Sequence, residues 1–234
     1  MEKIKWGSEP EYFGPRHYYR ESLLINHINK NLKEGSILDA GFGNGSLSLR
    51  LSKGNYNIIG IDLSQEFIDY ASEKIQSPKI KLKKGDITNL DFKNNTFDGI
   101  VCSEVLEHIE EEEEAIKEFY RTLKEDGKLF ISVPANPKLW DKSDEWAGHK
   151  RRYTKNQLKK LLEANGFKII KIHYWGFPLT RLYHRKIYLK TLNNQKLKKT
   201  KLKKYSKYLS NIFKIDNLFN NLPLGIGLIV VAQK

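Results

Sequence analysis

Short apolar runs alternate along this chain with longer segments in which apolar residues recur at helical spacing. The runs that fit buried strands cover residues 36–40, 57–61, 79–83, 97–102, 128–133, 167–174 and 227–232. The helical segments cover residues 16–33, 45–53, 65–77, 110–123 and 155–165. Strands that alternate with helices form right-handed crossovers in a mostly parallel sheet with helices on both faces. The pattern therefore predicts a seven-stranded α/β fold.

One long segment, residues 178–222, separates the sixth expected strand from the seventh. Its pattern, as in LYHRKIYLKTL, is helical and amphipathic, so we expect two or three helices that pack on the sheet domain. We accordingly predict one domain over residues 1–234. Residues 1–33 would form an N-terminal cap and helix, and residues 178–222 a basic helical insertion.

Most of the positive charge lies in this insertion. The chain carries a net charge of +13, and residues 178–222 contain twelve Lys or Arg against one acid, which leaves +2 for the rest. The stretch Lys196–Lys207 is compatible with a solvated structural cap, with contact to a membrane surface or lipid-like substrate through residues 181–214, and with nucleic-acid binding. An insertion at this point of the sheet would also help to form a substrate pocket.

The cysteine and histidine content narrows the classes of protein further. Cys102 is the single cysteine, which excludes an intrachain disulfide and suits a reducing cytoplasm. We expect a cytoplasmic protein, because the N-terminus has no apolar run and no stretch approaches the roughly 20 apolar residues of a membrane span. The histidines do not show metal-ligand spacing, so no metal is predicted.

Candidate chemistry begins in a glycine turn after the first expected strand. Asp39 is followed by Gly41, Gly43 and Gly45, and a helix begins directly after them. Glycines let the backbone of such a loop approach a ligand closely at a helix N-terminus. The spacing differs from the dinucleotide pattern G-x-G-x-x-G, because position 46 is serine. The turn also lacks the Lys or Arg of a phosphate cradle, so its acid favours a cationic ligand.

Polar residues also follow the next three expected strands, at the edge where open parallel sheets bind ligands. Asp62 lies 21 residues beyond Gly41, a separation that suits two hydrogen bonds to a ribose, although it could simply cap a helix. Asp86 and Ile87 could hold the amine and the face of a base, or form an ordinary turn. Ser103 and Glu104 end the fourth strand.

The segments ILDAGFGNG, GIDLS, KGDI and FDGIVCSEVLEHI occur in this order. Together they resemble the nucleoside-binding motifs of class I S-adenosylmethionine-dependent methyltransferases, in particular the ubiquinone and menaquinone biosynthesis branch. The resemblance covers roughly residues 30–175 and the final strand. It implies a Rossmann-like sheet whose last strand is antiparallel, with S-adenosyl-L-methionine as cofactor and S-adenosyl-L-homocysteine as product.

The resemblance also implies a role for each motif. The 39–45 loop would hold the methionine part of the cofactor, and Ser103 with Glu104 would lie beneath the sulfonium. Asp62 with Leu63 would bind the ribose, and Asp86 with Ile87 the adenine. In relatives the N-terminal segment folds over the cofactor, which suggests a lid that contains Tyr18 or Tyr19.

The reaction would be an in-line displacement of the methyl group from sulfur. Alignment of the reactants can contribute about 7–11 kcal/mol, so a general base is optional. The candidates for a base or a substrate-positioning residue are His108, His149 and Tyr153, the last two in a loop that resembles a GH-RRY element of the same branch. Each of these residues could instead have a purely structural role. His108 could be hydrogen-bonded between helix and sheet, and His149 and Tyr153 could hold the loop in place.

Three functions remain open at this stage. The first is methyl transfer to a small-molecule or lipid-like acceptor, with oxygen favoured over nitrogen or carbon. The second is methylation of tRNA or rRNA guided by the basic insertion, although the Asp/Asn-Pro-Pro-Tyr/Phe motif of enzymes that methylate nucleobase amines is absent after the fourth strand. The third is a non-catalytic module that binds S-adenosylmethionine. The sequence gives no indication of the oligomeric state.

The ribose assignment can be tested directly. We expect Asp62→Ala to weaken S-adenosyl-L-methionine binding at least about tenfold, because a two-fold contact to the ribose would be lost and its partners left unpaired. Isothermal titration calorimetry measures the change, and an unaltered affinity would remove the ribose assignment.

Overall fold

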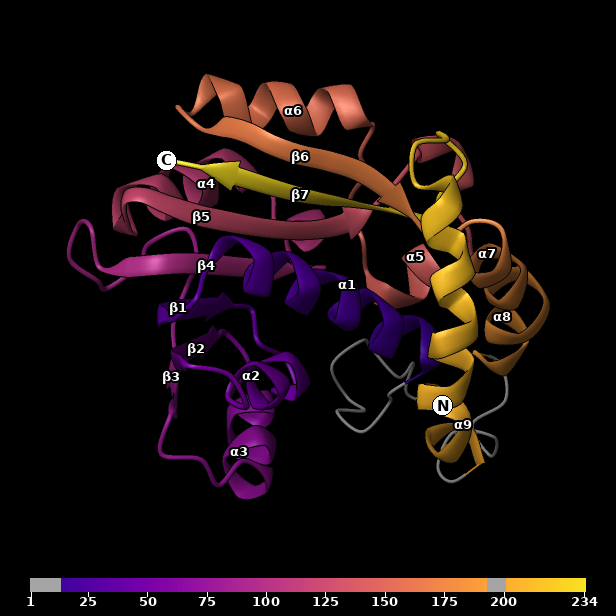
Figure 1. Cartoon of the computed structure of the whole chain (residues 1–234), viewed down its shortest axis with the longest axis horizontal. Coiled ribbons are helices and arrows are strands. Elements are labelled where there is room, and N and C mark those ends of the chain that lie inside the picture. The colour runs from indigo at the N-terminus through magenta and orange to yellow at the C-terminus, as the bar shows by residue number, and fades with distance from the viewer. Residues whose placement is uncertain (1–13, 193–200) are drawn as a thin grey trace.

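The computed structural model describes residues 14–192 and 201–234, with the side chains of 191 and 201–204 left aside. The first part of the predicted N-terminal cap and most of Lys196–Lys207 therefore lie outside the described side chains. Within these ranges seven strands form one sheet in the order β3-β2-β1-β4-β5-β7-β6 (Figure 1). The strands are β1 (Gly35–Ala40), β2 (Tyr56–Asp62), β3 (Ile80–Lys84), β4 (Phe97–Ser103), β5 (Leu123–Pro134), β6 (Lys168–Trp175) and β7 (Gly227–Gln233).

The strand pairing confirms the predicted topology. Neighbouring strands from β3 through β5 run parallel, and β7 pairs antiparallel with both β5 and β6. The antiparallel last strand therefore lies one position inside the sheet, with β6 at the edge. Because the strands alternate in side-chain direction, Ile37 and Leu38 of β1 enter the cores on opposite faces.

Helices cover both faces of the sheet. One core contains Ile116 of α4 (Glu112–Thr122) and Leu162 of α6 (Lys155–Ala164). The other core contains Leu24 of α1 (Pro15–Asn31) and Leu51 of α2 (Ser46–Leu51). A smaller cluster joins the glycine turn to α3 (Gln65–Lys74) through Phe42. The predicted Rossmann-like arrangement is thus confirmed.

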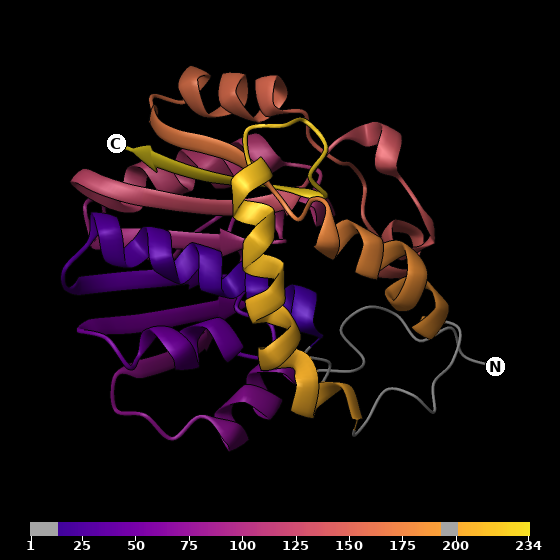
Figure 2. The same cartoon turned by 45° about the vertical axis from the view of Figure 1, so that its right-hand side comes forward.

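The insertion is helical, as its periodicity predicts. It consists of α7 (Leu179–Tyr183), a π-helical turn (His184–Tyr188), α8 (Leu189–Thr191), α9 (Lys201–Ile212) and a 3₁₀ segment (Phe213–Phe219). Figures 1 and 2 show α9 crossing α1 on the outside of the sheet. At this crossing the ring of Tyr19 meets Trp175 and Phe213 edge to face, with centroids 6.1 and 6.0 Å away. No helix in the described ranges is both long and apolar enough to cross a membrane.

Two parts of the secondary structure differ from the expected pattern. A short helix, α5 (Lys142–Ala147), was not predicted, because six residues are too few to show helical periodicity. Its start is fixed instead by a capping box in which Asp141 and Asp144 each accept a hydrogen bond from the other end of the turn. Strand β5 begins at Leu123, five residues earlier than expected, because Leu123 pairs with Phe97.

A buried carboxylate fastens the two ends of the insertion together. Asp216 has no exposed surface, and its two oxygens accept hydrogen bonds from the amides of Leu179 (2.8 Å) and Thr180 (2.9 Å) at the start of α7. These amides have no helical partner of their own. Asp216 therefore ties the 3₁₀ segment to the start of α7, beside the ring contact of Tyr183 with Phe213.

We expect Asp216→Ala to lower the free energy of unfolding by about 2–4 kcal/mol, since two buried amides would lose their acceptor. Denaturant titration of both proteins measures the difference. Asp91→Ala, which removes an exposed carboxylate, serves as the matched control and should change the value by less than about 0.5 kcal/mol. Equal effects of the two substitutions would contradict the role given to Asp216.

Candidate active site

A cavity of about 610 Å³ lies at the carboxyl ends of β1, β4 and β5, between α1 and the helices of the insertion. Seven of the residues predicted for the site line it: Asp39, Gly41, Gly43, Ser103, Glu104, His108 and His149. The other seven do not line it: Tyr19, Gly45, Asp62, Leu63, Asp86, Ile87 and Tyr153. The structure thus brings the glycine turn, the end of β4 and the loop after β5 around one space.

The backbone of the turn after β1 takes conformations that favour glycine. Gly41 and Gly43 have φ angles of +76° and +55°, in the left-handed region that side chains disfavour. A Cβ on Gly41 would lie 2.5 Å from a methyl carbon of Val105, whereas one on Gly43 would meet no atom within 4 Å. Gly43 is therefore required by its backbone conformation and leaves open space beside the cavity, where a ligand can approach the main chain.

Asp62 braces this turn from behind. Its Oδ2 accepts a hydrogen bond from the amide of Gly43 at 2.9 Å, and its Oδ1 accepts one from the amide of Ser64 at 2.9 Å. Burial raises the pKa of Asp62, against the lowering effect of these amides. The carboxylate thus has a structural task beside the ribose contact predicted for it, which stays a prediction.

The residues predicted to hold a base lie further along the sheet edge. Asp86 is exposed, and its Oδ1 accepts hydrogen bonds from the amide and hydroxyl of Thr88 at 2.8 and 2.7 Å. Ile87 is 5% exposed and belongs to the core, whereas Leu63 is 58% exposed. Asp86 therefore shapes a turn in this structure, and its adenine contact stays a prediction.

Asp39 is the most unusual acid of the cavity wall. It is only 2% exposed, and the hydroxyl of Ser48 donates to its Oδ2 at 2.5 Å. Burial raises the pKa of Asp39 to about 7, against the lowering effect of the Ser48 hydrogen bond and with a further increase from the charge of Glu21. A cation that enters the cavity beside Asp39 would favour the ionised carboxylate.

Glu104 differs from Asp39 because it has a cation beside it. Its Oε2 lies 3.2 Å from Nη1 of Arg20, and Ser132 donates to its Oε1 at 3.0 Å. Burial would raise the pKa of Glu104, but Arg20 and then Arg16 outweigh it, so its pKa lies below the usual range. Its φ of +57° is unusual for a residue with a side chain, as is typical where a function constrains the backbone.

Arg20 is a cavity residue that sequence reasoning missed. It is 7% exposed, and its Nε has no hydrogen-bond partner among the described residues, although its other nitrogens contact Glu104 and His17. A buried guanidinium N–H without an acceptor is costly and calls for an anionic ligand group. Its position on the helical face of α1 was readable, but its proximity to Glu104, 84 positions later, was not.

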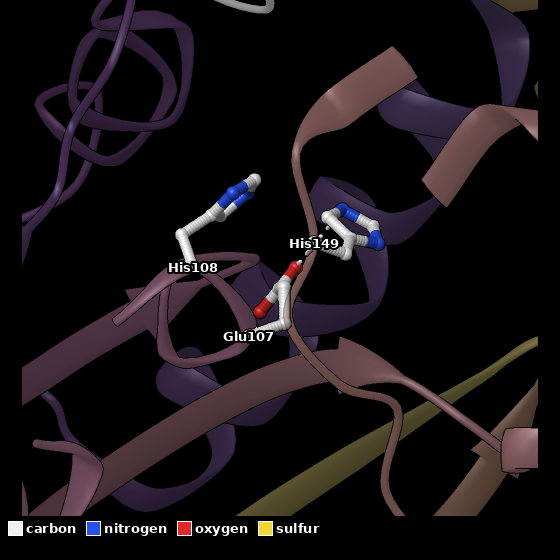
Figure 3. Close-up of side chains that lie close together, drawn as sticks. All are labelled: Glu107, His108 and His149. Carbon is white, nitrogen blue, oxygen red and sulfur yellow. Dashed lines mark ion pairs between the residues drawn. The ribbon is translucent and has the colours of Figure 1, made fainter. Parts of the chain in front are cut away.

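Glu107, His108 and His149 converge on the other side of Glu104. Figure 3 shows the Glu107 carboxylate directed at the His149 ring, with Oε1 3.8 Å from Nε2, and the His108 ring beside them. The rings of His108 and His149 meet edge to face, with centroids 4.8 Å apart. Burial, with the neighbouring His149, lowers the pKa of His108 to about 4. His108 is therefore a neutral neighbour of His149.

Glu107 is a buried carboxyl group without compensation. It has no exposed surface, and neither of its oxygens accepts a hydrogen bond from another described residue. Burial, with the charge of Glu104, raises the pKa of Glu107 well above its usual range. The ligand atoms of the three residues lie within 4.8 Å of one another, whereas donors bound to one metal ion at about 2.0–2.2 Å lie at most about 4.4 Å apart. The spacing is thus slightly wider than that of donors bound to one ion, and the absence of a metal stays a prediction.

Asp144 orients His149. The Nδ1 of His149 lies 2.8 Å from Asp144 Oδ1, while Nε and Nη2 of Arg152 donate to the same carboxylate at 2.8 and 2.7 Å. Burial would raise the pKa of Asp144, but the hydrogen bonds from His149 and Arg152 outweigh it, and the carboxylate stays ionised. An ionised acceptor at Nδ1 keeps a proton there, so the lone pair of the neutral ring is on Nε2.

The two tyrosines predicted for the site point elsewhere. Tyr153 is 3% exposed, and its hydroxyl donates to Oε2 of Glu112 at the start of α4. Arg151 makes an ion pair with the same Glu112 at 2.9 Å, so this half of the loop is fastened to the acidic helix. Tyr19 is 1% exposed, and its hydroxyl donates to Asn217 at 2.8 Å in the crossing of α1 with the insertion.

The high pKa of Asp39 predicts a pH-dependent stability. Its pKa of about 7 in the fold exceeds the ordinary value of 3.8, so the folded state binds the proton more tightly. This stabilisation is complete below about pH 4 and is lost as the pH rises to 7. Relative to Asp39→Asn, the wild-type chain should lose about 2–3 kcal/mol of unfolding free energy between pH 5 and pH 7.

Denaturant titrations at pH 5, 6, 7 and 8 measure this difference. The exposed carboxylate of Asp69 provides a control, and Asp69→Asn should follow the wild-type pH dependence. Parallel curves for wild type and Asp39→Asn would show that Asp39 does not take up a proton in this range.

Comparison with known proteins gives a consistent result. Residues 38–131 match the family described as "Methyltransferase domain". A segment of 110 residues is 36% identical to the demethylmenaquinone methyltransferase of Lactobacillus johnsonii and covers 43% of this chain and 45% of that protein. A segment of 104 residues is 35% identical to the ubiquinone biosynthesis O-methyltransferase of Coxiella burnetii and covers 44% of each chain. In these matches the chain spans less than half the length of either relative.

Among solved structures, the crystal structure of the cyclase SpnF is similar over 98% of this chain and 85% of its own, with a TM-score of 0.71 and 21% identity. This likeness concerns the fold, which therefore does not by itself determine the reaction. The family match adds the glycine turn and the strand ends that surround the cavity. Residues 38–131 are thus similar to a methyltransferase domain, and they contain the glycine turn and Glu104 of the cavity.

Proposed function

We propose that this chain transfers a methyl group from S-adenosyl-L-methionine to a hydroxyl group of a small or lipid-like acceptor. The observation that carries the proposal is the composition of the cavity described above. An open glycine turn with acids lies on one side of it, and a histidine oriented by a carboxylate lies on the other. The donor supplies a methyl group on a sulfonium and leaves as a thioether.

The described residues fit the methionine part of this cofactor. Asp39 and Glu104 supply negative charge for an ammonium and a sulfonium, and the buried Nε–H of Arg20 is available to a carboxylate. Gly43 leaves its main chain open to close approach. The protein has little covalent work to do, and holding the donor and acceptor in line is its main contribution.

His149 is the candidate base. Methylation of a hydroxyl releases its proton, and the lone pair on Nε2 of His149, held in place through Nδ1 by Asp144, can accept it. The proton moves from the acceptor oxygen to Nε2, and the ionised Asp144 stabilises the imidazolium. This geometry supports oxygen as the methylated atom, as does the similarity to the ubiquinone biosynthesis O-methyltransferase of Coxiella burnetii.

Methylation of RNA is the second candidate, on the strength of the basic insertion. Tyr205 and Tyr208 of α9 are exposed (56% and 67%) and could stack on bases. The aromatic and apolar residues in the cavity wall, such as Trp140 and Leu189, fit a smaller acceptor equally well. A non-catalytic binding module would share the glycine turn and the acids but would not need the His149–Asp144 pair.

A transfer experiment separates these functions. S-adenosyl-L-methionine labelled in its methyl group is incubated with the full chain and with lipid, small-metabolite and RNA fractions of a cell extract. Label in the lipid or metabolite fraction is expected. Label in RNA alone would establish the second candidate, and tight cofactor binding without any transfer would leave a binding module.

If His149 is the base, its substitution should lower the rate of methyl transfer and leave the affinity for S-adenosyl-L-methionine nearly unchanged. We expect His149→Gln to reduce the rate of methyl transfer by about 10²–10⁴-fold, because the proton of the hydroxyl would lose its acceptor. The dissociation constant of S-adenosyl-L-methionine, measured by calorimetry, should change less than about twofold. His27→Gln, in a histidine pair remote from the cavity (His27 Nε2 to His173 Nε2, 2.9 Å), is the control. A rate equal to that of the control would remove His149 from the reaction.

A further inference from the structure

The charges around the cavity are sorted by sign, except that the acid Asp141 lies among the basic residues, where it accepts a hydrogen bond from His184. The acids Glu21, Asp39 and Glu104 lie on the side of the glycine turn. A second group of residues, which we call the basic wall, comes from other elements and consists of Arg16, Lys138, Arg181 and Arg185. Arg16 lies at the start of α1, Lys138 in the 3₁₀ turn Pro137–Leu139, and the two remaining arginines in α7 and the π-helical turn.

One side of the insertion's first helix supplies half of this wall. Arg181, His184, Arg185 and Tyr188 are spaced by three, four and seven positions, so they share one helical face. All four line the cavity. Leu182 and Ile187, which fall between them, are exposed (56% and 45%). The helix therefore turns its basic and aromatic face toward the cavity and leaves apolar residues outside.

The position of Arg16 is fixed without neutralising its charge. Its Nη1 lies 2.8 Å from Nδ1 of His184, and its guanidinium lies 4.4 Å from the centre of the Tyr188 ring. A guanidinium can only donate, so Nδ1 of His184 accepts and the ring proton is on Nε2, which donates to Asp141 at 2.9 Å. His184 is thus a neutral bridge, and Arg16 keeps its full charge in the cavity wall.

Acids compensate the basic wall only in part: the charge of Arg16 acts on Glu104, and Asp141 lies beside His184. Two other cations of the cavity are paired, Arg20 with Glu104 and Arg152 with Asp144. In residues 14–192 and 201–234, no carboxylate side chain forms an ion pair with any member of the basic wall. Four like charges on one side of a cavity repel one another, and this cost is offset when an anion binds between them.

We propose that the acceptor carries a phosphate or pyrophosphate ester, which the basic wall binds while the hydroxyl to be methylated lies at His149. This inference rests on the proposed function, since it deepens the acceptor half of the same cavity. Guanidinium groups match phosphate oxygens in paired hydrogen bonds, and four cations suit a dianion better than a single carboxylate. Trp140, Tyr183 and Leu189 in the same wall would contact the remainder of the acceptor.

Inorganic pyrophosphate is the probe for this site. The full chain, saturated with S-adenosyl-L-homocysteine, is titrated with pyrophosphate in a calorimeter at constant ionic strength. We expect saturable binding to one site. The double substitution Arg181→Gln/Arg185→Gln should weaken it at least about tenfold, the loss of two charge-assisted contacts. The affinity for S-adenosyl-L-homocysteine in this variant should stay within about twofold of the wild-type value, which also verifies folding.

The control is Lys159→Gln/Lys160→Gln, which removes the same charge from exposed positions of α6. Equal weakening in both variants, or heats no larger than those for chloride, would overturn the proposal. If the wild-type chain failed to bind S-adenosyl-L-homocysteine, the proposed function would fail, and the same titration without it would still test the basic wall.

Two competitors identify the source of the phosphate. Glucose 1-phosphate represents soluble sugar phosphates, and farnesyl phosphate below its micelle-forming concentration represents lipid phosphates. Displacement of pyrophosphate by either supports the site, and the one effective at lower concentration gives the acceptor class. Displacement by neither would overturn the assignment to phosphate esters.

Discussion

The burial of several carboxyl groups at the ends of the central strands is the constraint on which the site depends. An ionised acid out of water needs a cation or strong donors, and each acid meets this need differently. Glu104 has Arg20, and Asp144 has Arg152 and His149, so both stay ionised. Asp39 has the hydroxyl of Ser48, and its pKa is about 7, while no side chain of the described residues donates a hydrogen bond to Glu107. Neighbouring acids thus hold different protonation states.

Because of these protonation states, the two sides of the cavity differ in charge. Ionised and titratable acids face the glycine turn, where a cationic donor fits, and the neutral His108 separates them from the His149–Asp144 pair. His149 lies between the neutral His108 and the carboxylate of Asp144, so the lone pair of its ring keeps a defined direction. The low dielectric constant of the protein interior makes a charge without a partner unfavourable. It also strengthens each hydrogen bond and ion pair that is formed.

The sequence predicted what is local. The glycine turn, the acids at strand ends and the helical insertion follow from residues close together in the chain, and Asp39, Gly43 and Glu104 do meet at one cavity. Contacts between segments that are far apart in the chain could not be predicted from the sequence. Arg20 meets Glu104 because α1 packs over the end of β4, and Arg16 meets His184 because the insertion packs beside α1. The contact of Asp144 with His149 does not follow from the sequence, although the spacing of Asp141 and Asp144 is compatible with the capping box that they form.

The family match ends at residue 131, and this boundary divides the cavity. Asp39, Gly43 and Glu104 lie within the matched region, whereas His149, Asp144 and the basic wall lie outside it. In the proposed function, the residues that face the donor, apart from Arg20, therefore lie in the matched stretch, and the residues that face the acceptor lie outside it. If the proposed roles hold, substitutions in the outer stretches would change which molecule is methylated and leave the acids and the glycine turn of the donor side intact. Such a division lets one domain acquire new acceptors in the course of evolution without rebuilding its reaction centre.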